Sequence, residues 1–413
     1  MQSITPSIER ANTRHLYWDM FWMCAAFAVD WYFLQVFAIR MNATPLQIGL
    51  LVSLRAAFLV VGSTLANYWR HRYKNPIPAM VLPIIAYRAL LYLPVVFVVY
   101  LPQAQRVDTL VWLVALSSIP TGISQGIFVG MMRYAVHQDN LASLVARRSI
   151  LMNAGILVWV LGIGQFLEHV PFPLNYQISF GVAFLVSLLS LWHIWRIKCP
   201  DRVEAASESS DGLTLNVWKN SAFVRFAVIL VAINASVFIS APLIPLQLVR
   251  ALNASDAWIS AFGVFEMGAG ALLMMRMSWL IARFGTAKLI VVTTFMTAFH
   301  TLILGMTTTL PPYLIGVLLF GAGWYAVNVL LYNWLVEIVP HEDFPHYAVA
   351  YQLLINISLF VGPLLGTFLV TNLMTIPAAL ILIALVRVAA AYLAWALRPE
   401  PIAAVLNRPV EVT

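Results

Sequence analysis

Charged residues are scarce in this sequence of 413 residues, because Asp, Glu, Lys and Arg together make up only 10% of it. A soluble protein carries about 25% of such residues. Hydrophobic residues make up 62% of the chain, and the mean hydropathy is +0.85. A soluble domain has too little polar surface to cover so many apolar side chains. The composition therefore excludes a soluble enzyme, a nucleic-acid-binding module and a disordered protein, and it predicts a chain surrounded mainly by lipid.

Cysteine and hydrophilic stretches are also scarce. The two cysteines, Cys24 and Cys199, argue against a disulfide framework and against a cysteine metal site. The first apolar run is too long for a signal-peptide core, so we expect it to be retained as a span rather than cleaved. The one sizeable hydrophilic interruption, 197–219, has the composition of a solvated linker. We predict no cofactor and no metal.

Long apolar runs are abundant instead. A helix that crosses a bilayer needs about 20 residues, and each span with its loop takes roughly 30 to 35, so the chain has room for about 12 to 14 spans. Continuous apolar character favours helices over barrel strands. We therefore predict an all-α polytopic membrane protein with about 12 transmembrane helices. The predicted spans are 16–40, 47–67, 78–101, 108–132, 146–168, 174–196, 220–248, 256–281, 287–309, 311–336, 345–371 and 375–397.

The distribution of Lys and Arg predicts the orientation of these spans. The formal net charge is +7, and in membrane proteins such an excess collects in cytoplasmic loops. If both termini are cytoplasmic, only Arg40, Arg106 and Arg250 fall in outer loops or at outer span ends. We therefore predict cytoplasmic termini in a plasma membrane (the inner membrane of a bacterium) and no nucleic-acid partner.

An internal repeat indicates two related halves. Asn-Ala-Thr at 42–44 recurs as Asn-Ala-Ser at 253–255, an offset of 211 residues, and 149–167 aligns without gaps to 351–369. Both pairs occupy equivalent places in the order of spans. We predict two pseudo-symmetric six-helix bundles joined by a cytoplasmic linker, with boundaries at 1–196, 197–219 and 220–413.

The stretch NATPLQIGLL at 42–51 is similar to the start of the second helix of the major facilitator superfamily, and the chain resembles that family. Two six-helix halves, a charged central linker and inside termini extend the resemblance over nearly the whole chain. The resemblance implies a secondary transporter whose two bundles alternate around a central site near the bilayer midplane.

The family's signature loop, between helices 2 and 3, is only partly represented. In the family it carries Gly, Asp-Arg, Gly and basic residues, whereas the loop at 66–74 and its counterpart at 278–285 both lack the acidic residue. The charge latch that this motif provides elsewhere in the family is therefore not supported here. By resemblance, the candidate gating-loop residues are Arg70, Arg72, Lys74, Arg283 and Gly285.

Two opposite charges are predicted at the same depth in the membrane. Asp30 lies about ten residues from the outer end of the first span and Arg55 about nine from that of the second, at a rise of about 1.5 Å per residue. We expect them to form an ion pair, because each then offsets the desolvation of the other. Such a pair is either a switch sensitive to protons or substrate, or a static structural contact.

Glu266 is a third charged candidate. It follows Arg55 by the same 211 residues as the Asn-Ala repeat, so the two halves carry opposite charges at equivalent sites. A lone carboxyl in hydrocarbon is normally neutral, which makes Glu266 a candidate proton carrier or cation contact. The resemblance implies that Asp30, Arg55 and Glu266 lie near the transport path.

Other ionisable residues in the spans have more ordinary interpretations. Arg88, His300 and Arg387 fall on helices that the resemblance makes peripheral, so structural pairing is favoured, with proton shuttling by His300 left open. Asp19 and Arg276 lie near cytoplasmic span ends and are expected to snorkel towards water.

Amides and tryptophans inside the spans supply hydrogen bonds and stacking faces for a neutral solute, with helix–helix contact as the alternative. The candidates for the substrate path are Gln125, Asn153, Trp324, Asn328 and Asn356. The same reasoning applies to Gln35, Asn234, Trp31 and Trp159.

Glycine spacing predicts where helices approach closely. Gly122, Gly126 and Gly130 follow one another at intervals of one helical turn and form a stripe for a neighbouring helix. Gly362–Gly366, which contains Pro363, predicts a kink or a close contact. The equivalent segment of the first half has no proline, unlike the family's drug/proton antiporters, so drug efflux is less supported.

Together these features predict a monomeric secondary active transporter of a small solute, with proton coupling through Asp30 and Glu266 as a hypothesis. Sugars, organic ions, peptides and amphipathic drugs stay open as substrates, as do direction and coupling ion. The alternatives are a transport-inactive receptor or scaffold, and a membrane-embedded enzyme. The enzyme is less favoured because the cluster that comes nearest to a catalytic site is interpreted as a polar cytoplasmic turn. A weak metal contact there stays open. This cluster comprises His341, Glu342, Asp343 and His346.

Overall fold

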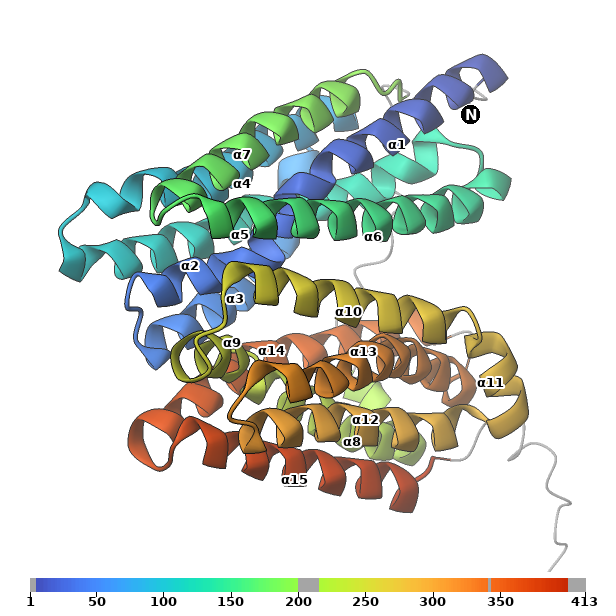
Figure 1. Cartoon of the computed structure of the whole chain (residues 1–413). Coiled ribbons are helices and arrows are strands. Elements are labelled where there is room, and N and C mark those ends of the chain that lie inside the picture. Colours follow the sequence, from blue (N-terminus) through green and yellow to red (C-terminus); the bar gives the residue numbers. More distant parts are fainter. Residues whose placement is uncertain (1–4, 200–214, 341–342, 400–413) are drawn as a thin grey trace, which may run out of the picture. The chain divides into compact units, whose positions relative to one another are not determined.

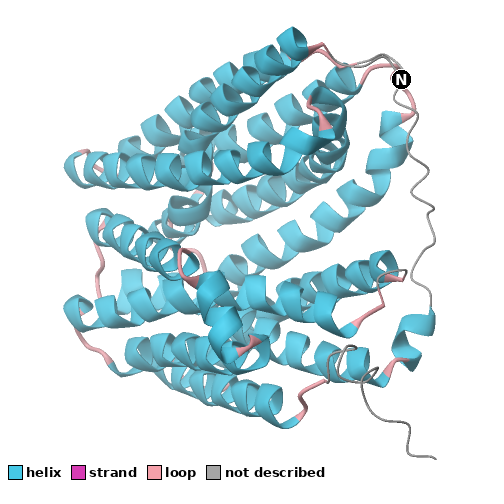
Figure 2. Cartoon of the chain, turned by 90° about the vertical axis from the view of Figure 1, so that its right-hand side faces the viewer, coloured by secondary structure: helices cyan, strands magenta, loops and turns pink. Residues whose placement is uncertain are grey.

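The computed structural model describes residues 5–199, 215–340 and 343–399, and over these ranges the chain folds into helices without a strand (Figures 1 and 2). Twelve helical segments in this part of the chain are long and apolar enough to cross a membrane. The predicted all-α architecture with about 12 spans is therefore confirmed. Most of the predicted linker, together with His341 and Glu342, lies outside the described residues.

The chain groups into two compact units, and the first comprises the described residues of Met1–Ser207 together with Asn253–Val264. A π-helical turn interrupts its first span, and a short 3₁₀ turn ends its third. Within this unit α3 packs against α5, α4 against α5 and α7, and α1 against α6 and α7. Its elements are α1 (Pro6–Ala28), η1 (Val29–Phe33), α2 (Leu34–Arg40), α3 (Pro45–Arg70), α4 (Pro76–Phe97), η2 (Val98–Tyr100), α5 (Gln103–Ala135), α6 (Gln138–His169) and α7 (Leu174–Trp195).

The second unit comprises the described residues of Glu208–Leu252 and Phe265–Thr413. Within it α12 packs against α13 and α15, and α8 packs against α14 and α15. Its elements are η3 (Leu215–Lys219), α8 (Ser221–Ser240), α9 (Leu243–Leu246), η4 (Gln247–Ala251), α10 (Asp256–Met274), α11 (Met277–Phe284), α12 (Thr286–Met306), α13 (Leu310–Ile338), α14 (Phe344–Asn372) and α15 (Ile376–Ala396). The first turns of α10 group with the first unit and the rest with the second. The predicted division into two six-helix bundles stays a prediction.

Each unit has an apolar interior and an apolar exterior. In the second unit Phe226 and Trp334 are fully buried and meet edge to face, whereas Leu385 and Trp395 on α15 are exposed. Helices that are hydrophobic on all sides suit a lipid environment, because their outer faces need no water. The exposed apolar side chains agree with the surroundings of lipid that the hydrophobic composition predicts.

The repeated Asn-Ala motif has a common backbone role. Asn42 and Asn253 have φ angles of 68° and 50°, and among the described residues they are the only positive values outside glycine. Asparagine tolerates this left-handed conformation better than most residues, so it can end one helix and redirect the chain into the next. Thr44 then caps α3 in a reciprocal capping box with Gln47, and Ser255 accepts a hydrogen bond from the amide three residues on.

Glycines let α3 and α5 approach closely. A Cβ at Gly122 would lie 2.5 Å from a backbone oxygen of α3, and one at Gly62 would overlap a backbone oxygen of α5. A Cβ at Gly126 would lie 2.9 Å from a side chain of α3. The predicted contact is confirmed at Gly122 and Gly126. It is wrong at Gly130, where no atom lies within 4 Å and the helix–helix contact has ended.

The second unit contains similar contacts. Gly321 of α13 faces the backbone of Glu266 in α10, and Gly362 and Gly366 of α14 face the backbone and side chains of α8. Close packing at Gly362–Gly366 is therefore confirmed, and Pro363 lies inside one continuous helix.

The predicted span at 256–281 is wrong at its C-terminal end. The helix stops at Met274, and a turn through the exposed Arg276 leads into α11 as a separate helix. Gly285, with a φ angle of 80°, then joins α11 to α12. The apolar run continues across this break because α11 carries large hydrophobic residues of its own, so hydropathy alone does not reveal the turn.

Candidate functional site

Asp30 and Arg55 form a bidentate ion pair in the first unit. Nη1 of Arg55 donates to Oδ1 of Asp30 over 2.7 Å, and Nη2 donates to Oδ2 over 2.8 Å. The Asp30 side chain is only 6% exposed and that of Arg55 33%. The pairing predicted from equal depth is therefore confirmed. Two parallel charge-assisted bonds hold the guanidinium in one orientation.

The local backbone around Asp30 is irregular. Asp30 lies in η1, a π-helical turn in the middle of the first span. Turns of this kind are rare and frequent at functional sites, because the inserted residue changes the direction of the side chains that follow. Nothing in the sequence pattern predicts this turn.

Glu266 lies in the second unit in a contrasting environment. Its side chain is partly buried, and it has no hydrogen bond or ion pair with any residue in the described part of the chain. Its backbone faces Gly321 of α13, which has no side chain to separate the two helices. The first unit thus holds an acid in an ion pair, and the second holds an acid that has no partner among the described residues.

The predicted amide and tryptophan candidates lie on four helices, α5, α6, α13 and α14. The side-chain amides of Asn153 and Asn328 each donate to the carbonyl oxygen one turn earlier in their own helix, and Asn356 accepts a bond from the glutamine one turn earlier. Gln125 is exposed on α5. Trp324 stacks on a phenylalanine of α13 with an interplanar angle of 6°. Gln125 and Asn153 belong to the first unit, as Asp30 and Arg55 do, and the other three belong to the second.

Three buried amide oxygens have no hydrogen-bond partner among the described residues: those of Gln35, Asn234 and Gln247. An unpaired buried acceptor costs about 1 to 3 kcal/mol, so such groups normally bind water or a ligand. Gln35 belongs to the first unit and the other two to the second. Gln247, in the π-helical turn η4, is a candidate that sequence reasoning missed.

The prediction that Asp19 snorkels is wrong. Its side chain is buried, with Oδ2 accepting a bond from Arg148 over 3.0 Å and Oδ1 one from Ser190 over 2.7 Å. Arg88 donates to the same serine over 2.8 Å. Because α6 and α7 bring donors to the carboxylate, it is satisfied without reaching water. The sequence predicts Arg148 to be a cation of a cytoplasmic loop, because it follows Arg147. Only the packing of the helices shows that it is buried.

Arg387 and His300 agree with a structural role. The buried guanidinium of Arg387 donates to the backbone oxygen of Thr297 over 2.6 Å and to groups of α8. Nε2 of His300 is hydrogen-bonded to the hydroxyl of Tyr313 over 2.5 Å. These bonds join α8, α12, α13 and α15 within the second unit.

A cluster around Asp256 escaped the sequence reasoning. Asp256, the first residue of α10, is buried, and its Oδ1 accepts bonds from Nη2 of Arg40 over 2.9 Å and from the hydroxyl of Tyr176 over 2.6 Å. Glu168 accepts a further bond from the next backbone amide, that of Ala257, over 3.2 Å. The members lie far apart in the sequence, and no local spacing connects them.

We expect Tyr176→Phe to lower the stability of the protein by about 1.5 to 3 kcal/mol, the range for a hydrogen bond to a charged group. The measurement is thermal and denaturant unfolding of purified protein in detergent. Tyr392→Phe is the matched control, because that tyrosine is exposed and no hydrogen bond of its hydroxyl is present in the described structure. Equal stabilities of the two variants would contradict a contribution of the Tyr176–Asp256 bond.

The predicted gating-loop arginines contact groups three or four residues away in their own helix or loop. Arg70 donates to a backbone oxygen three residues on, Arg72 donates to a tyrosine hydroxyl one turn back, and Arg283 lies over an indole ring one turn back. Lys74 is exposed, and Gly285 has the positive φ angle that favours glycine. Within the described ranges none of the four cations contacts a carboxylate, so no charge latch is formed there.

No group of three or more His, Cys, Asp or Glu side chains in the described residues could hold a metal ion. The predicted polar turn can be followed only from Asp343 onward.

Comparison with known proteins gives one family. The model of the Major Facilitator Superfamily matches residues 19–335 and 226–411. No curated protein sequence matches the chain.

Several solved transporters share the fold. A mutant of the nucleoside transporter NupG has 10% sequence identity and a TM-score of 0.75, with 94% of this chain and 99% of that chain covered. The xylose transporter XylE from E. coli, in an inward-open conformation, has 15% identity and a TM-score of 0.62 over 96% and 97%. A bacterial homologue of the human lysosomal transporter Spinster has 13% identity and a TM-score of 0.67 over 96% and 98%. Identities this low show a common fold and leave the substrate undefined.

Proposed function

The chain belongs to the Major Facilitator Superfamily, and from this premise we propose that it is a secondary active transporter that moves a small solute by alternating access. The observation that carries the proposal is the bidentate Asp30–Arg55 pair in the middle of the first two spans. A buried charge pair at that depth is expensive to desolvate, and intramembrane ionisable groups commonly mark transport pathways.

We propose further that proton binding drives the cycle. Protonation of Asp30 would remove its charge and break both bonds to Arg55, which frees the guanidinium for a solute or for another conformation. Glu266, which has no partner in the described residues, would take up or release a proton without first breaking an ion pair. Two acids with different surroundings would then respond to different steps of the cycle.

The orientation, location and oligomeric state of the protein are also proposed. We propose cytoplasmic termini, supported by the asymmetry of Lys and Arg, together with a plasma-membrane location and a monomer. The two six-helix bundles of the predicted division would be the moving parts. Labelling of single cysteines placed in predicted inner and outer loops tests this orientation.

Uptake into proteoliposomes tests transport and coupling together. A thermal-shift screen of purified protein selects the solute, starting from the classes named for structural neighbours: nucleosides and xylose. We expect an inward proton gradient to raise the initial uptake rate at least fivefold. Identical rates with and without the gradient would contradict proton coupling while leaving transport intact.

Glu266→Gln is expected to remove most of the gradient effect while solute binding, measured by thermal shift, is retained. An amide has nearly the shape of the acid but carries no exchangeable carboxyl proton. Asp139→Asn is the control, because its side chain is 87% exposed. A Glu266→Gln protein that responds to the gradient as the wild type does would exclude Glu266 as the proton carrier.

A transport-inactive receptor or scaffold is the second candidate. It is favoured by the loop cations Arg70, Arg72 and Arg283, which contact no carboxylate in the described residues. Solute binding without any flux in the same proteoliposomes would select it.

A further inference from the structure

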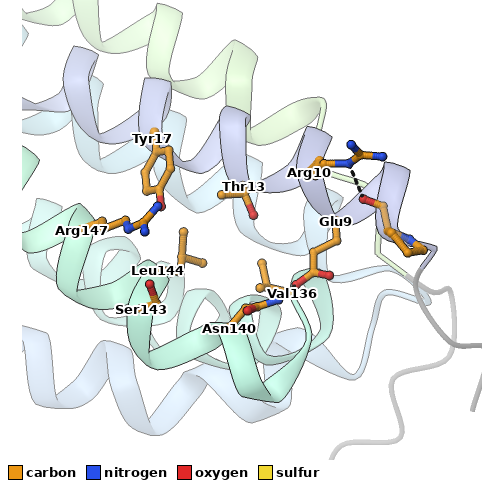
Figure 3. Close-up of a pocket in the computed structure, with 10 residues that line it drawn as sticks. Glu9, Arg10, Thr13, Tyr17, Val136, Asn140, Ser143, Leu144 and Arg147 are labelled. Atoms are coloured by element: carbon orange, nitrogen blue, oxygen red, sulfur yellow. Dashed lines mark hydrogen bonds between the residues drawn. The ribbon is translucent and has the colours of Figure 1, made fainter.

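A polar cavity lies at the start of α1, distant from Asp30 and Arg55. It has a volume of about 350 Å³ and is bounded by the first three turns of α1 and the beginning of α6 (Figure 3). Tyr17 is the lining residue of α1 nearest to Asp30 in the sequence, and their separation of 13 positions corresponds to about 20 Å of helix. The volume is within the range of small-molecule sites. By the predicted orientation the cavity opens at the cytoplasmic surface.

One end of the cavity carries a fixed negative charge. Oε1 of Glu9 accepts bonds from the backbone amide of His137 over 3.0 Å and from the side chain of Asn140 over 2.9 Å. Figure 3 shows Glu9 directed from α1 towards Asn140. Its second oxygen, Oε2, has no hydrogen bond with the described residues and is left for a cationic group.

The opposite end carries a positive charge, that of Arg147. Arg147 of α6 makes no hydrogen bond or ion pair within the described structure, and Figure 3 places its guanidinium beside the ring of Tyr17. The hydroxyl groups of Thr13 and Ser143 lie between the two ends and likewise have no hydrogen bond to a described residue. A guanidinium in this setting is a ready donor for phosphate or carboxylate oxygens.

Arg10 also lines the cavity but does not face Arg147. Its Nε donates to the backbone oxygen of Pro6 over 3.2 Å, and its side chain runs along α1 (Figure 3). The two charges that oppose each other across the cavity are therefore those of Glu9 and Arg147.

We propose that this cavity binds a zwitterionic group, with its ammonium at Glu9 and its phosphate or carboxylate at Arg147. Glu9 and Tyr17 are about 12 Å apart along α1. That length accommodates two contacts of about 3 Å and a ligand whose charges lie several ångströms apart. The same chemistry has two sources, the ethanolamine phosphate headgroup of a membrane lipid and a free small zwitterion. A pocket between helices at the cytoplasmic side that offers a basic side chain, here Arg147, is suited to the phosphate of a lipid headgroup.

Thermal unfolding of the purified full chain in detergent tests the proposal with two pairs of probes. Palmitoyl-oleoyl-phosphatidylethanolamine is compared with the phosphatidylglycerol of the same acyl chains, and glycerophosphoethanolamine with glycerol 3-phosphate. In each pair only the first molecule has an ammonium group. We expect the ammonium-bearing probe to raise the unfolding midpoint more in at least one pair. A preference in the lipid pair alone assigns a lipid headgroup, and a preference in the soluble pair assigns a free zwitterion.

Substitutions of Glu9 and Arg147, at the two ends of the cavity, test the proposal further. Arg147→Gln should raise the concentration for a half-maximal shift at least fivefold for the preferred probe, and Glu9→Gln should abolish the preference for ammonium. Arg14→Gln is the matched control, because Arg14 is exposed on α1, the helix that carries Glu9, and does not line the cavity. Since Arg147 makes no bond to a described residue, its substitution should leave the unliganded midpoint unchanged even if Glu9→Gln weakens the contacts to His137 and Asn140.

Two results would overturn the proposal. One is equal stabilisation of the wild type by the members of both probe pairs, and the other is an Arg147→Gln protein that responds as Arg14→Gln does. Neither result depends on transport, so the proposed transport activity stands or falls separately.

Discussion

Replacing Arg55 by alanine will lower the stability of the protein by about 3 to 5 kcal/mol, the range for breaking a buried ion pair from one side. The reason is the carboxylate left behind, because the Asp30 side chain is only 6% exposed and both of its oxygens bond to Arg55. Asp30→Ala should cost less, since the guanidinium that it leaves is 33% exposed and is therefore less desolvated than the carboxylate. The measurement is denaturant unfolding of purified protein in detergent micelles.

The double variant Asp30→Asn with Arg55→Gln should recover most of the lost stability, because two neutral amides avoid an unpaired buried charge. Arg225→Ala serves as the control, since Arg225 is exposed on α8 and has no ion pair in the described residues. If the double variant is as unstable as Arg55→Ala, charge pairing is not what stabilises this contact. Equal losses for Arg55→Ala and Asp30→Ala would contradict the argument from unequal burial.

Valine at Gly122 will cost about 3 kcal/mol or more, because overpacking of this size must displace backbone and not only side chains. A Cβ there would already lie 2.5 Å from a backbone oxygen of α3, before the two methyl groups of valine are added. Gly130→Val on the same face of α5 should change stability by less than about 1 kcal/mol, since the added atoms meet nothing and glycine is a weak helix former. The same unfolding assay and the yield of folded protein measure both.

Gly126→Val should fall between the two, because a Cβ there would meet a single atom, the Cβ of Ala66 at 2.9 Å, whereas one at Gly122 would meet several backbone atoms of α3. This series tests the helix–helix contact with one substitution type on one helix. If Gly130→Val destabilises the protein as much as Gly122→Val, intrinsic valine propensity rather than close packing decides the effect.

Much of the architecture was predictable, because lipid imposes strict rules on the chain. Each backbone polar group must be bonded internally, so every long apolar run has to become a helix. The Asp30–Arg55 pair was predictable for a related reason, since the rise per residue converts sequence position into depth. The Asn-Ala repeat was recognisable because both copies meet the same backbone requirement, a positive φ angle after a helix.

Other features depend on side chains from helices that are distant in the sequence. Asp19 lies near a span end, where a charge normally reaches water, and it is buried because α6 and α7 supply Arg148 and Ser190. Gly130 continues the glycine stripe in the sequence, but the partner helix has no atom within 4 Å of a Cβ there. Periodicity shows which face of a helix is smooth, and it does not show how far the neighbour follows it.

The scarcity of charged residues was enough to predict a membrane protein of about 12 helices, because an unbroken run of about 20 apolar residues is stable in lipid as a helix. The sequence also identified Asp30, Arg55 and Glu266 as costly charges in that setting. Tertiary structure alone decided which charges have partners. It joined Asp256 to Arg40 and Tyr176, and it left Glu9 and Arg147 at opposite ends of a cavity. Depth along a helix follows from chain position, whereas contact between helices depends on how their faces pack.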